Sequence, residues 1–129
     1  MQIVHDRYGI PWVKAAEKRD HSESWEQQVL IQRAMGWIVA HVPNGGKRSK
    51  SEAERLRREG VMAGFPDLVC IRQGVVVFVE MKRTKNGALH GEQKHVIPAL
   101  MRAGAEVYVC EGWEAALWSL EHGKRRPWN

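Results

Sequence analysis

Two apolar runs separated by three residues place the tightest constraint on the fold of this chain. The runs PDLVCI (66–71) and VVVFVEMK (75–82) are rich in strand-forming residues, and the RQG between them predicts a tight turn. Together they predict a hairpin of two β-strands. Side chains two apart in a strand share a face, so Glu80 and Lys82 lie side by side. The hairpin also brings Asp67 to the same end of the molecule.

The rest of the chain alternates between helical and strand-like patterns. Apolar spacing and end signals predict helices from 22 to about 36 and over 51–59, 91–103 and 113–122, with strands over 37–42 and 105–110. Ser51 is the expected N-cap of the short second helix. We therefore expect one α/β domain over 22–122, preceded by an arm (1–21) and followed by a basic tail (123–129).

The excess of positive charge is concentrated in three segments. The formal charge is +5, and the basic residues gather at 45–60, 82–85 and 123–129. A polyanion is the natural partner of such clusters, although any one of them can also be a solvated surface. Three clusters in a chain of 129 residues favour a nucleic acid.

The sequence does not support a membrane protein or a protein with a metal–thiolate site. No apolar segment approaches the roughly 20 residues of a membrane span, and the N-terminus lacks the apolar core of a signal peptide. We therefore expect a cytoplasmic protein without membrane contact. Cys70 and Cys110 lie in apolar runs without CxxC spacing or a neighbouring His cluster, so we expect buried thiols and neither a zinc site nor a disulfide.

Asp67, Glu80 and Lys82 would place two carboxylates and an ammonium at one end of the hairpin. Burying such charges is unfavourable unless they are paired or bound to a cation. Hard oxygen ligands of this kind suit Mg²⁺ or Mn²⁺, which keep bound waters and bridge phosphate oxygens. For an isolated E-x-K pattern the alternative is a simple salt bridge at a strand end.

Four ordered motifs sharpen this interpretation: PNGG (43–46), GVMAGFPDL (60–68), FVEMK (78–82) and HGEQ (90–93). In this order they resemble the VRR-NUC family of the PD-(D/E)xK nuclease superfamily, and the resemblance covers about residues 22 to 114. It implies an α/β restriction-endonuclease-like core with a mixed central β-sheet flanked by helices. It also implies a divalent-metal-dependent deoxyribonuclease.

The resemblance also assigns roles to individual residues. It implies that Asp67, Glu80 and the backbone carbonyl of Met81 bind the metal, Mg²⁺ or Mn²⁺. Lys82 would position or activate the attacking water and offset charge on the phosphate. Gln93 matches the family glutamine and would orient the substrate or the lysine. His90 stands where the family has a serine.

The superfamily expects a further acid on the first helix, and the chain offers Glu23 and Glu26. Helical-wheel geometry favours Glu23, which lies near the centre of the apolar face. The family pattern instead fits WEQQVL (25–30), followed by Gly36, and favours Glu26. We prefer Glu26 as the catalytic metal ligand, with Glu23 as the alternative. Either acid could instead complement the helix dipole.

Stand-alone members of the family resemble junction resolvases, which implies a DNA endonuclease that cuts four-way (Holliday) junctions in a bacterial or phage-infected cell. The alternatives are a restriction-like or flap nuclease on the same core, or a non-catalytic nucleic-acid-binding module. DNA would be recognised by shape, through its phosphates. The expected DNA-binding residues are Asn44, Lys47, Arg48, Arg83 and Lys85.

We also predict a homodimer, because a two-fold junction requires two active sites at a fixed separation. The arm carries apolar residues that a partner could cover, namely Tyr8, Ile10, Pro11, Trp12 and Val13. Three tryptophans in or after the last helix could be covered in the same way, namely Trp113, Trp118 and Trp128. The alternative is that the arm packs on its own domain.

Overall fold

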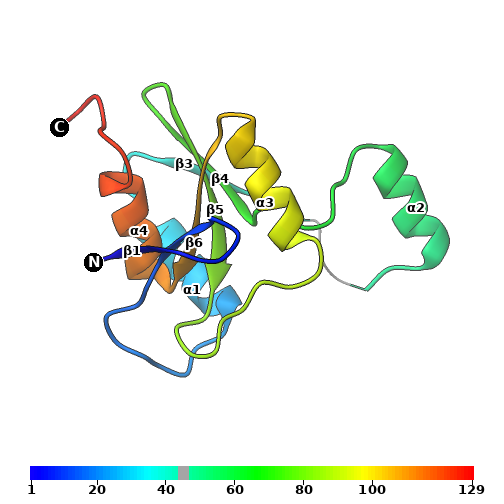
Figure 1. Cartoon of the computed structure of the whole chain (residues 1–129), viewed down its shortest axis with the longest axis horizontal. Coiled ribbons are helices and arrows are strands. Elements are labelled where there is room, and N and C mark those ends of the chain that lie inside the picture. Colours follow the sequence, from blue (N-terminus) through cyan, green and yellow to red (C-terminus); the bar gives the residue numbers. More distant parts are fainter. Residues whose placement is uncertain (44–46) are drawn as a thin grey trace.

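A six-stranded mixed sheet organises the protein (Figure 1), as seen in a computed structural model that describes residues 1–43 and 47–129. The strands are β1 (Ile3–His5), β2 (Pro11–Val13), β3 (Ile38–His41), β4 (Leu68–Arg72), β5 (Val75–Lys82) and β6 (Glu106–Glu111). The helices are α1 (Glu23–Arg33), α2 (Lys50–Arg58), α3 (Gln93–Arg102) and α4 (Trp113–His122). The sheet order is β1-β2-β6-β5-β4-β3. The predicted α/β fold with a mixed sheet is confirmed.

The predicted hairpin forms the middle of this sheet. β4 and β5 pair antiparallel, with Leu68 opposite Val79 and Arg72 opposite Val75. The two residues between the strands, Gln73 and Gly74, both have positive φ, as a tight two-residue hairpin turn with right-handed twist requires. β5 also pairs with β6 in parallel, which makes the sheet mixed.

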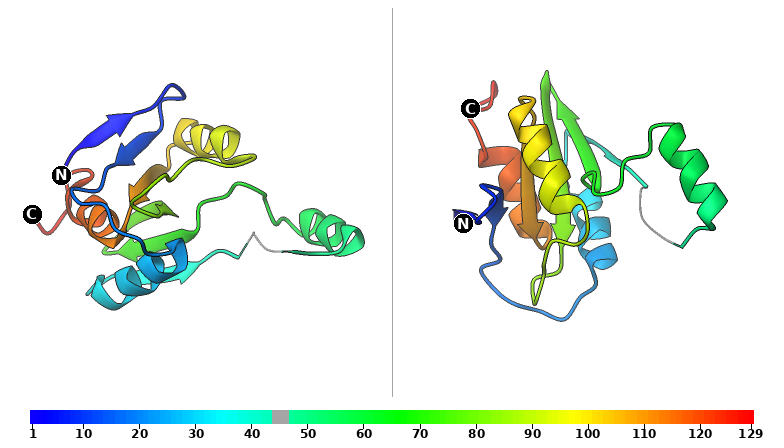
Figure 2. Two further views of the ribbon diagram at one scale, coloured as in Figure 1. Left: turned by 90° about the horizontal axis from the view of Figure 1, so that it is seen from below. Right: turned by 45° about the vertical axis from the view of Figure 1, so that its right-hand side comes forward.

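Helices cover both faces of the sheet (Figure 2). α1 and α4 pack on one face, where Leu30 and Leu120 meet the inward side chains of β4, β5 and β6. α3 covers the other face, where Ile97 meets Val107 and Val109 of β6. The end of β5 that carries Glu80 and Lys82 is therefore covered on both faces of the sheet. Both cysteines are free and buried, as predicted, and burial raises the pKa of each thiol to about 12.

The N-terminal residues are part of the sheet and not an arm. β1 and β2 form an antiparallel hairpin, and β2 pairs in parallel with β6. Ile10, Trp12 and Val13 are buried in the two cores of their own domain. The prediction of an arm outside the core is therefore wrong. The physical reason is that the free edge of β6 offers hydrogen-bond partners for the backbone of β2. Docking there also buries the apolar side chains of β2, and a three-residue strand can achieve neither alone.

The C-terminal residues also dock on the domain. Arg126 is buried, and its guanidinium donates to both carboxylate oxygens of Glu106 at 2.8 and 2.7 Å. Trp128 packs against Trp37 in an edge-to-face contact. Within the expected basic tail, the charge of Arg126 is therefore paired with a carboxylate on β6. Trp113, Trp118 and Trp128 are covered at least in part by the core of their own chain.

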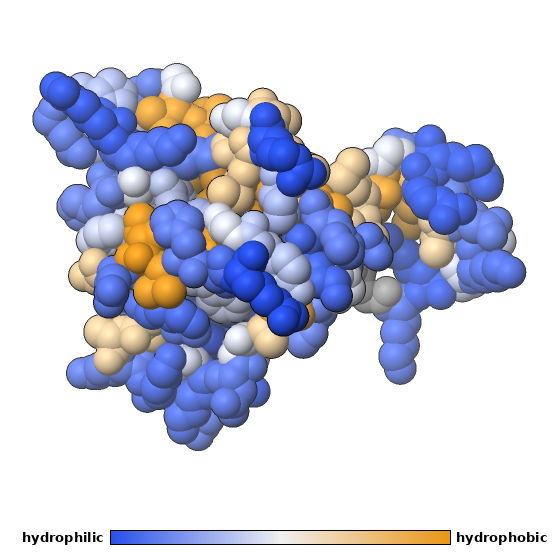
Figure 3. All heavy atoms as spheres, in the orientation of Figure 1, coloured by the Kyte–Doolittle hydropathy of each residue, from blue (hydrophilic) through white to orange (hydrophobic). Residues whose placement is uncertain are grey.

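The segment that carries α2 projects away from the rest of the molecule (Figures 1 and 2). The helix starts at Lys50, one residue earlier than predicted, because Ser49 and not Ser51 is the N-cap: its Oγ accepts from the N–H of Glu52 at 3.2 Å. No residue of α2 is buried. The face of this segment drawn in Figure 3 is mostly hydrophilic.

Candidate active site

The hairpin brings its acidic and basic residues together where β4 begins and β5 ends, as the sequence predicts. The N–H of Met81 donates to Oδ2 of Asp67 at 2.9 Å, which fixes that carboxylate beside β5. On β5, Nζ of Lys82 lies 3.4 Å from Oε2 of Glu80. Both of these side chains are almost fully buried. N–H and C=O of one strand residue point the same way, so the Met81 carbonyl faces the side of Asp67.

The third carboxylate of the site comes from the first turn of α1. Carboxylate oxygens of Glu23, Asp67 and Glu80 all lie within 4.8 Å of one another. The start of α1 is fixed by Ser22, whose Oγ accepts from the N–H of Trp25 at 3.0 Å. Glu23 is therefore held as the first residue of a capped helix, with its side chain directed at the end of the hairpin.

Glu26 faces a different set of partners. Its carboxylate is completely buried and accepts two hydrogen bonds from the guanidinium of Arg19, at 2.9 and 2.6 Å. It also accepts from the N–H of Trp113, at the start of α4. Both oxygens are engaged by protein donors, and the residue is not part of the carboxylate cluster. The geometry therefore brings Glu23, the alternative, and not the preferred Glu26, to the carboxylates of the hairpin.

Gln93, the first residue of α3, connects the lysine to the acid. Its Nε2 donates to Oε2 of Glu80 at 2.8 Å, and its Oε1 accepts from Nζ of Lys82 at 3.1 Å. The same Oε1 accepts from the backbone N–H of His90 at 2.9 Å. His90 therefore contributes its main chain to this contact. The arrangement fits the expectation that the glutamine orients the lysine.

A glycine allows the start of α3 to approach the site. Gly64 has φ +86°, and a Cβ at this position would lie 2.6 Å from the backbone carbon of Glu92 and 2.8 Å from the nitrogen of Gln93. Any other residue would push the helix away, because backbone atoms cannot yield at that distance. The glycine two residues before Pro66 in GFPD thus secures the position of Gln93 as well as that of Asp67.

The electrostatics of the cluster fit a divalent cation. Oε1 of Glu80 is buried and has no hydrogen-bond partner within the described residues. Burial, and then the charge of Asp67, raise the pKa of Glu80 to about 8, against the opposing effect of Lys82. A buried carboxylate oxygen without a donor is unfavourable unless a cation compensates it. Three clustered carboxylates and a nearby carbonyl form the hard oxygen set that Mg²⁺ and Mn²⁺ prefer.

The predicted DNA-binding residues are spread over two surfaces. Lys47 is exposed, and Arg48 donates to the Pro43 carbonyl at 3.2 Å. Arg83 and Lys85 both pair with Asp20, at 3.7 and 3.2 Å. Asn44, with the glycines of PNGG, lies outside the described residues.

A partly buried network of side chains lies beside the site, and no sequence pattern predicts it. Arg19 bridges Glu26 and Glu114, and its backbone N–H donates to Thr84 Oγ1 at 2.8 Å. The hydrogen bonds that its guanidinium donates, first to Glu114 and then to Glu26, raise the pKa of Arg19. Gly112 completes the contact, since a Cβ there would lie 2.8 Å from Thr84. These residues come from four separate parts of the chain, so no local pattern identifies them.

Comparison with known proteins agrees with the geometry. The family model described as the VRR-NUC domain matches residues 14–114. The chain belongs to the VRR-NUC family. Its domain is therefore a VRR-NUC nuclease domain, with the six-stranded sheet and four helices described above.

One solved structure, titled "VRR_NUC domain protein", is similar in fold. It has a TM-score of 0.66 and 23% sequence identity, and the alignment covers 81% of this chain and 88% of that one. No curated protein matches the VRR-NUC chain significantly. In the described part of the chain, no helix is long and apolar enough to cross a membrane.

Proposed function

We propose that this VRR-NUC protein is a divalent-metal-dependent DNA endonuclease, with Glu23, Asp67, Glu80 and the Met81 carbonyl holding Mg²⁺ or Mn²⁺. The observation that carries the proposal is the buried Oε1 of Glu80, which finds no donor in the part of the chain that the structure describes and lies within a cluster of three carboxylates. A structural salt bridge alone would leave this oxygen unsatisfied. It would also leave Glu23 and Asp67 to repel the same buried charge.

The bound cation would polarise the phosphate and lower the pKa of an attacking water. Lys82 and Gln93 have separate roles beside the cation. Lys82, held by Glu80 and Gln93, presents an ammonium that orients the water and offsets charge developing on the phosphate oxygens. Gln93 keeps this ammonium in place and donates to Glu80 at the same time. Burial of both charged groups strengthens these interactions relative to water.

Four-way junctions are the proposed substrate, and a homodimer is the proposed active form. Each chain carries one carboxylate cluster among its described residues, so paired incisions across a two-fold junction require two chains. The projecting segment around α2 offers exposed cationic side chains that can contact phosphates at a distance from the site. Four of the five apolar N-terminal residues no longer support the dimer, because their own domain buries Ile10, Pro11, Trp12 and Val13.

The test is cleavage of three labelled DNAs of matched sequence: a four-way junction, a flap and a plain duplex. Each is incubated with Mg²⁺, with Mn²⁺ and with chelator, beside a Lys82→Ala control. We expect symmetric cutting of the junction with metal, little cutting of the duplex, and none with chelator or with the variant. Preferential cutting of the flap or the duplex would refute the choice of substrate. Cutting in chelator would refute metal dependence.

A further inference from the structure

One row of side chains links the candidate active site to the N-terminal hairpin. Trp12 on β2 pairs with Val109 on β6, and Val109 pairs with Glu80 on β5. Paired strand residues share a face, so all three side chains lie on the side of the sheet covered by α3. Two strand spacings separate Trp12 from Glu80, roughly 10 Å. At about 3.4 Å per nucleotide in stacked DNA, this distance spans about three nucleotide steps, and fewer in an extended strand.

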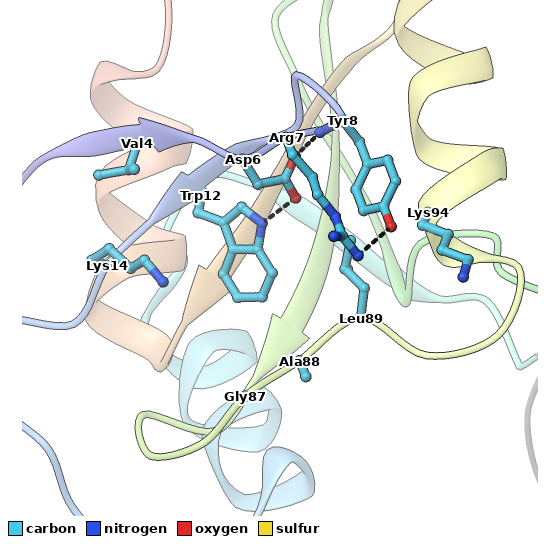
Figure 4. Close-up of a pocket in the computed structure, with 10 residues that line it drawn as sticks. All are labelled: Val4, Asp6, Arg7, Tyr8, Trp12, Lys14, Gly87, Ala88, Leu89 and Lys94. Atoms are coloured by element: carbon cyan, nitrogen blue, oxygen red, sulfur yellow. Dashed lines mark hydrogen bonds between the residues drawn. The ribbon is translucent and has the colours of Figure 1, made fainter.

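A cavity of about 580 Å³ opens at the β1–β2 end of this row (Figure 4). Tyr8 and Trp12 form its walls on the hairpin side, and the segment from Gly87 to Leu89 forms the opposite side. Gly87 joins the cavity to the active site directly, because a Cβ at this glycine would lie 2.9 Å from Cβ of Lys82. The loop that lines the cavity therefore also packs on the candidate catalytic lysine.

Aromatic and guanidinium groups face this cavity. The guanidinium carbon of Arg7 lies 5.0 Å from the ring centre of Tyr8, and its Nη2 donates to the Tyr8 hydroxyl at 2.9 Å. Tyr8 remains 38% exposed. The indole N–H of Trp12 donates to Asp6 at 2.9 Å, which fixes this ring at the wall. Aromatic rings and guanidinium planes are the groups on which proteins stack unpaired bases.

The charge around the cavity suits a phosphate backbone. Three cations line it, Arg7, Lys14 and Lys94, against the single acid Asp6. The Oδ1 of Asp6 accepts from the N–H groups of Tyr8 and Ile10, and its Oδ2 accepts from Trp12, so this acid is already satisfied within the hairpin.

Glu111, the acid between the cavity and Lys82, is neutralised as well. Lys14 and Lys18 lie 3.3 and 3.2 Å from its carboxylate, and the N–H of Ala15 donates to it. Among the described residues that line the cavity or lie between it and Lys82, the two acids Asp6 and Glu111 are therefore paired, and neither repels a strand.

We propose that the cavity holds an unstacked base of the DNA strand being cut, one to three nucleotides from the scissile phosphate. Tyr8 and Arg7 stack on the base, and Lys94 binds a flanking phosphate. This inference rests on the proposed nuclease function and adds to it a preference for substrates with unpaired nucleotides beside the incision, which an open junction centre supplies and a blunt duplex does not.

The test measures binding without cleavage. Fluorescence anisotropy in chelator follows a short labelled single-stranded oligonucleotide and the blunt duplex of the same sequence. We expect Tyr8→Ala and Arg7→Ala to bind the single strand about tenfold more weakly, the size that base stacking supplies, with duplex affinity changed less than about twofold. Tyr8→Phe keeps the ring and should retain wild-type affinity. Lys94→Ala should weaken single-strand binding more than Arg102→Ala, which removes an exposed cation at the other end of α3.

The outcomes separate this inference from the nuclease proposal. Equal single-strand affinity in the wild type, Tyr8→Ala and Arg7→Ala would overturn the base-binding cavity, even if the wild type cuts junctions with metal. Equal losses on single strand and duplex would overturn it too, because they would indicate general charge and not stacking. The expected binding pattern in a protein that cuts no DNA would support the cavity and refute the nuclease proposal. Melting temperatures of all variants, measured alongside, exclude unfolding as the cause of a loss.

Discussion

Exchanging the two acids of α1 for glutamine separates stability from catalysis. Glu26 is fully buried and holds the guanidinium of Arg19 and the N–H of Trp113. Glu23 is partly exposed and belongs to the cluster with Asp67 and Glu80. We therefore expect Glu26→Gln to lower the melting temperature while leaving cutting intact, and Glu23→Gln to abolish metal-dependent cutting without lowering the melting temperature.

The size of the first effect follows from the contacts. A glutamine at position 26 would retain one acceptor for the Trp113 N–H but turn an amide N–H₂ toward the guanidinium of Arg19. Breaking one partner of a buried ion pair costs about 3–5 kcal/mol. Arg19 is 26% exposed and keeps Glu114, so the lower end, about 3 kcal/mol, is appropriate. In a domain of 129 residues this lowers the melting temperature by about 10–15 °C.

The effect of Glu23→Gln has the opposite sign. Removing one charge from three clustered carboxylates relieves repulsion, so the melting temperature in chelator should stay level or rise slightly. The assay pairs thermal unfolding in chelator with junction cutting in Mg²⁺ at a temperature well below the melting point of both variants. Loss of cutting in a folded Glu26→Gln protein, with wild-type cutting in Glu23→Gln, would refute the assignment of the metal ligand.

The remaining predictions concern the lysine, the metal, the DNA and the oligomer. Lys82→Ala should abolish cutting and retain junction binding in a gel-shift assay, and wild-type cutting would remove this lysine from the mechanism. Because the pKa of Glu80 is raised to about 8, this carboxyl must lose a proton when the metal binds. The affinity for Mg²⁺, measured by calorimetry, should therefore rise about tenfold per pH unit up to about pH 8. An affinity that does not change between about pH 6 and 8 would contradict the raised pKa. In chelator, Lys47→Ala and Arg48→Ala should each reduce the salt slope of junction binding by about one, and a salt-independent affinity would exclude phosphate contacts. Light scattering at micromolar concentration should give the mass of a homodimer, and a monomer with full junction cutting would refute that state.

The sequence predicts those parts of the fold that depend on neighbouring residues, such as turns and helices. It does not predict contacts between segments that are distant in the chain. The β4–β5 hairpin, with Asp67 beside Glu80 and Lys82, follows from a two-residue turn and strand alternation alone. α4 matches its predicted bounds because its pattern is uninterrupted. β1 and β2 could not be found in the same way, because each has only three residues and depends on the edge of β6 for its partners.

The choice between Glu23 and Glu26 shows why the site itself was only partly predictable. Helical-wheel geometry favours Glu23 and the family pattern favours Glu26, and the two acids, three residues apart, differ by only about 60° around the helix axis. What separates them is Arg19, which lies outside the helix and pairs with Glu26. That arginine is positioned by Thr84, two residues after Lys82, through hydrogen bonds at its backbone N–H and carbonyl.

These contacts give the first turn of α1 two distinct tasks. On one side Glu23 completes a cluster of carboxylates around the buried Oε1 of Glu80, a site suited to a cation. On the other side Glu26 closes a hydrogen-bonded network that joins the N-terminal segment, the start of α4 and the chain just beyond Lys82. Protein donors compensate the buried charge of Glu26 with or without a metal, whereas a bound cation would compensate the charge of the cluster. Metal binding should therefore order the end of the hairpin without disturbing the network that holds α1 in place.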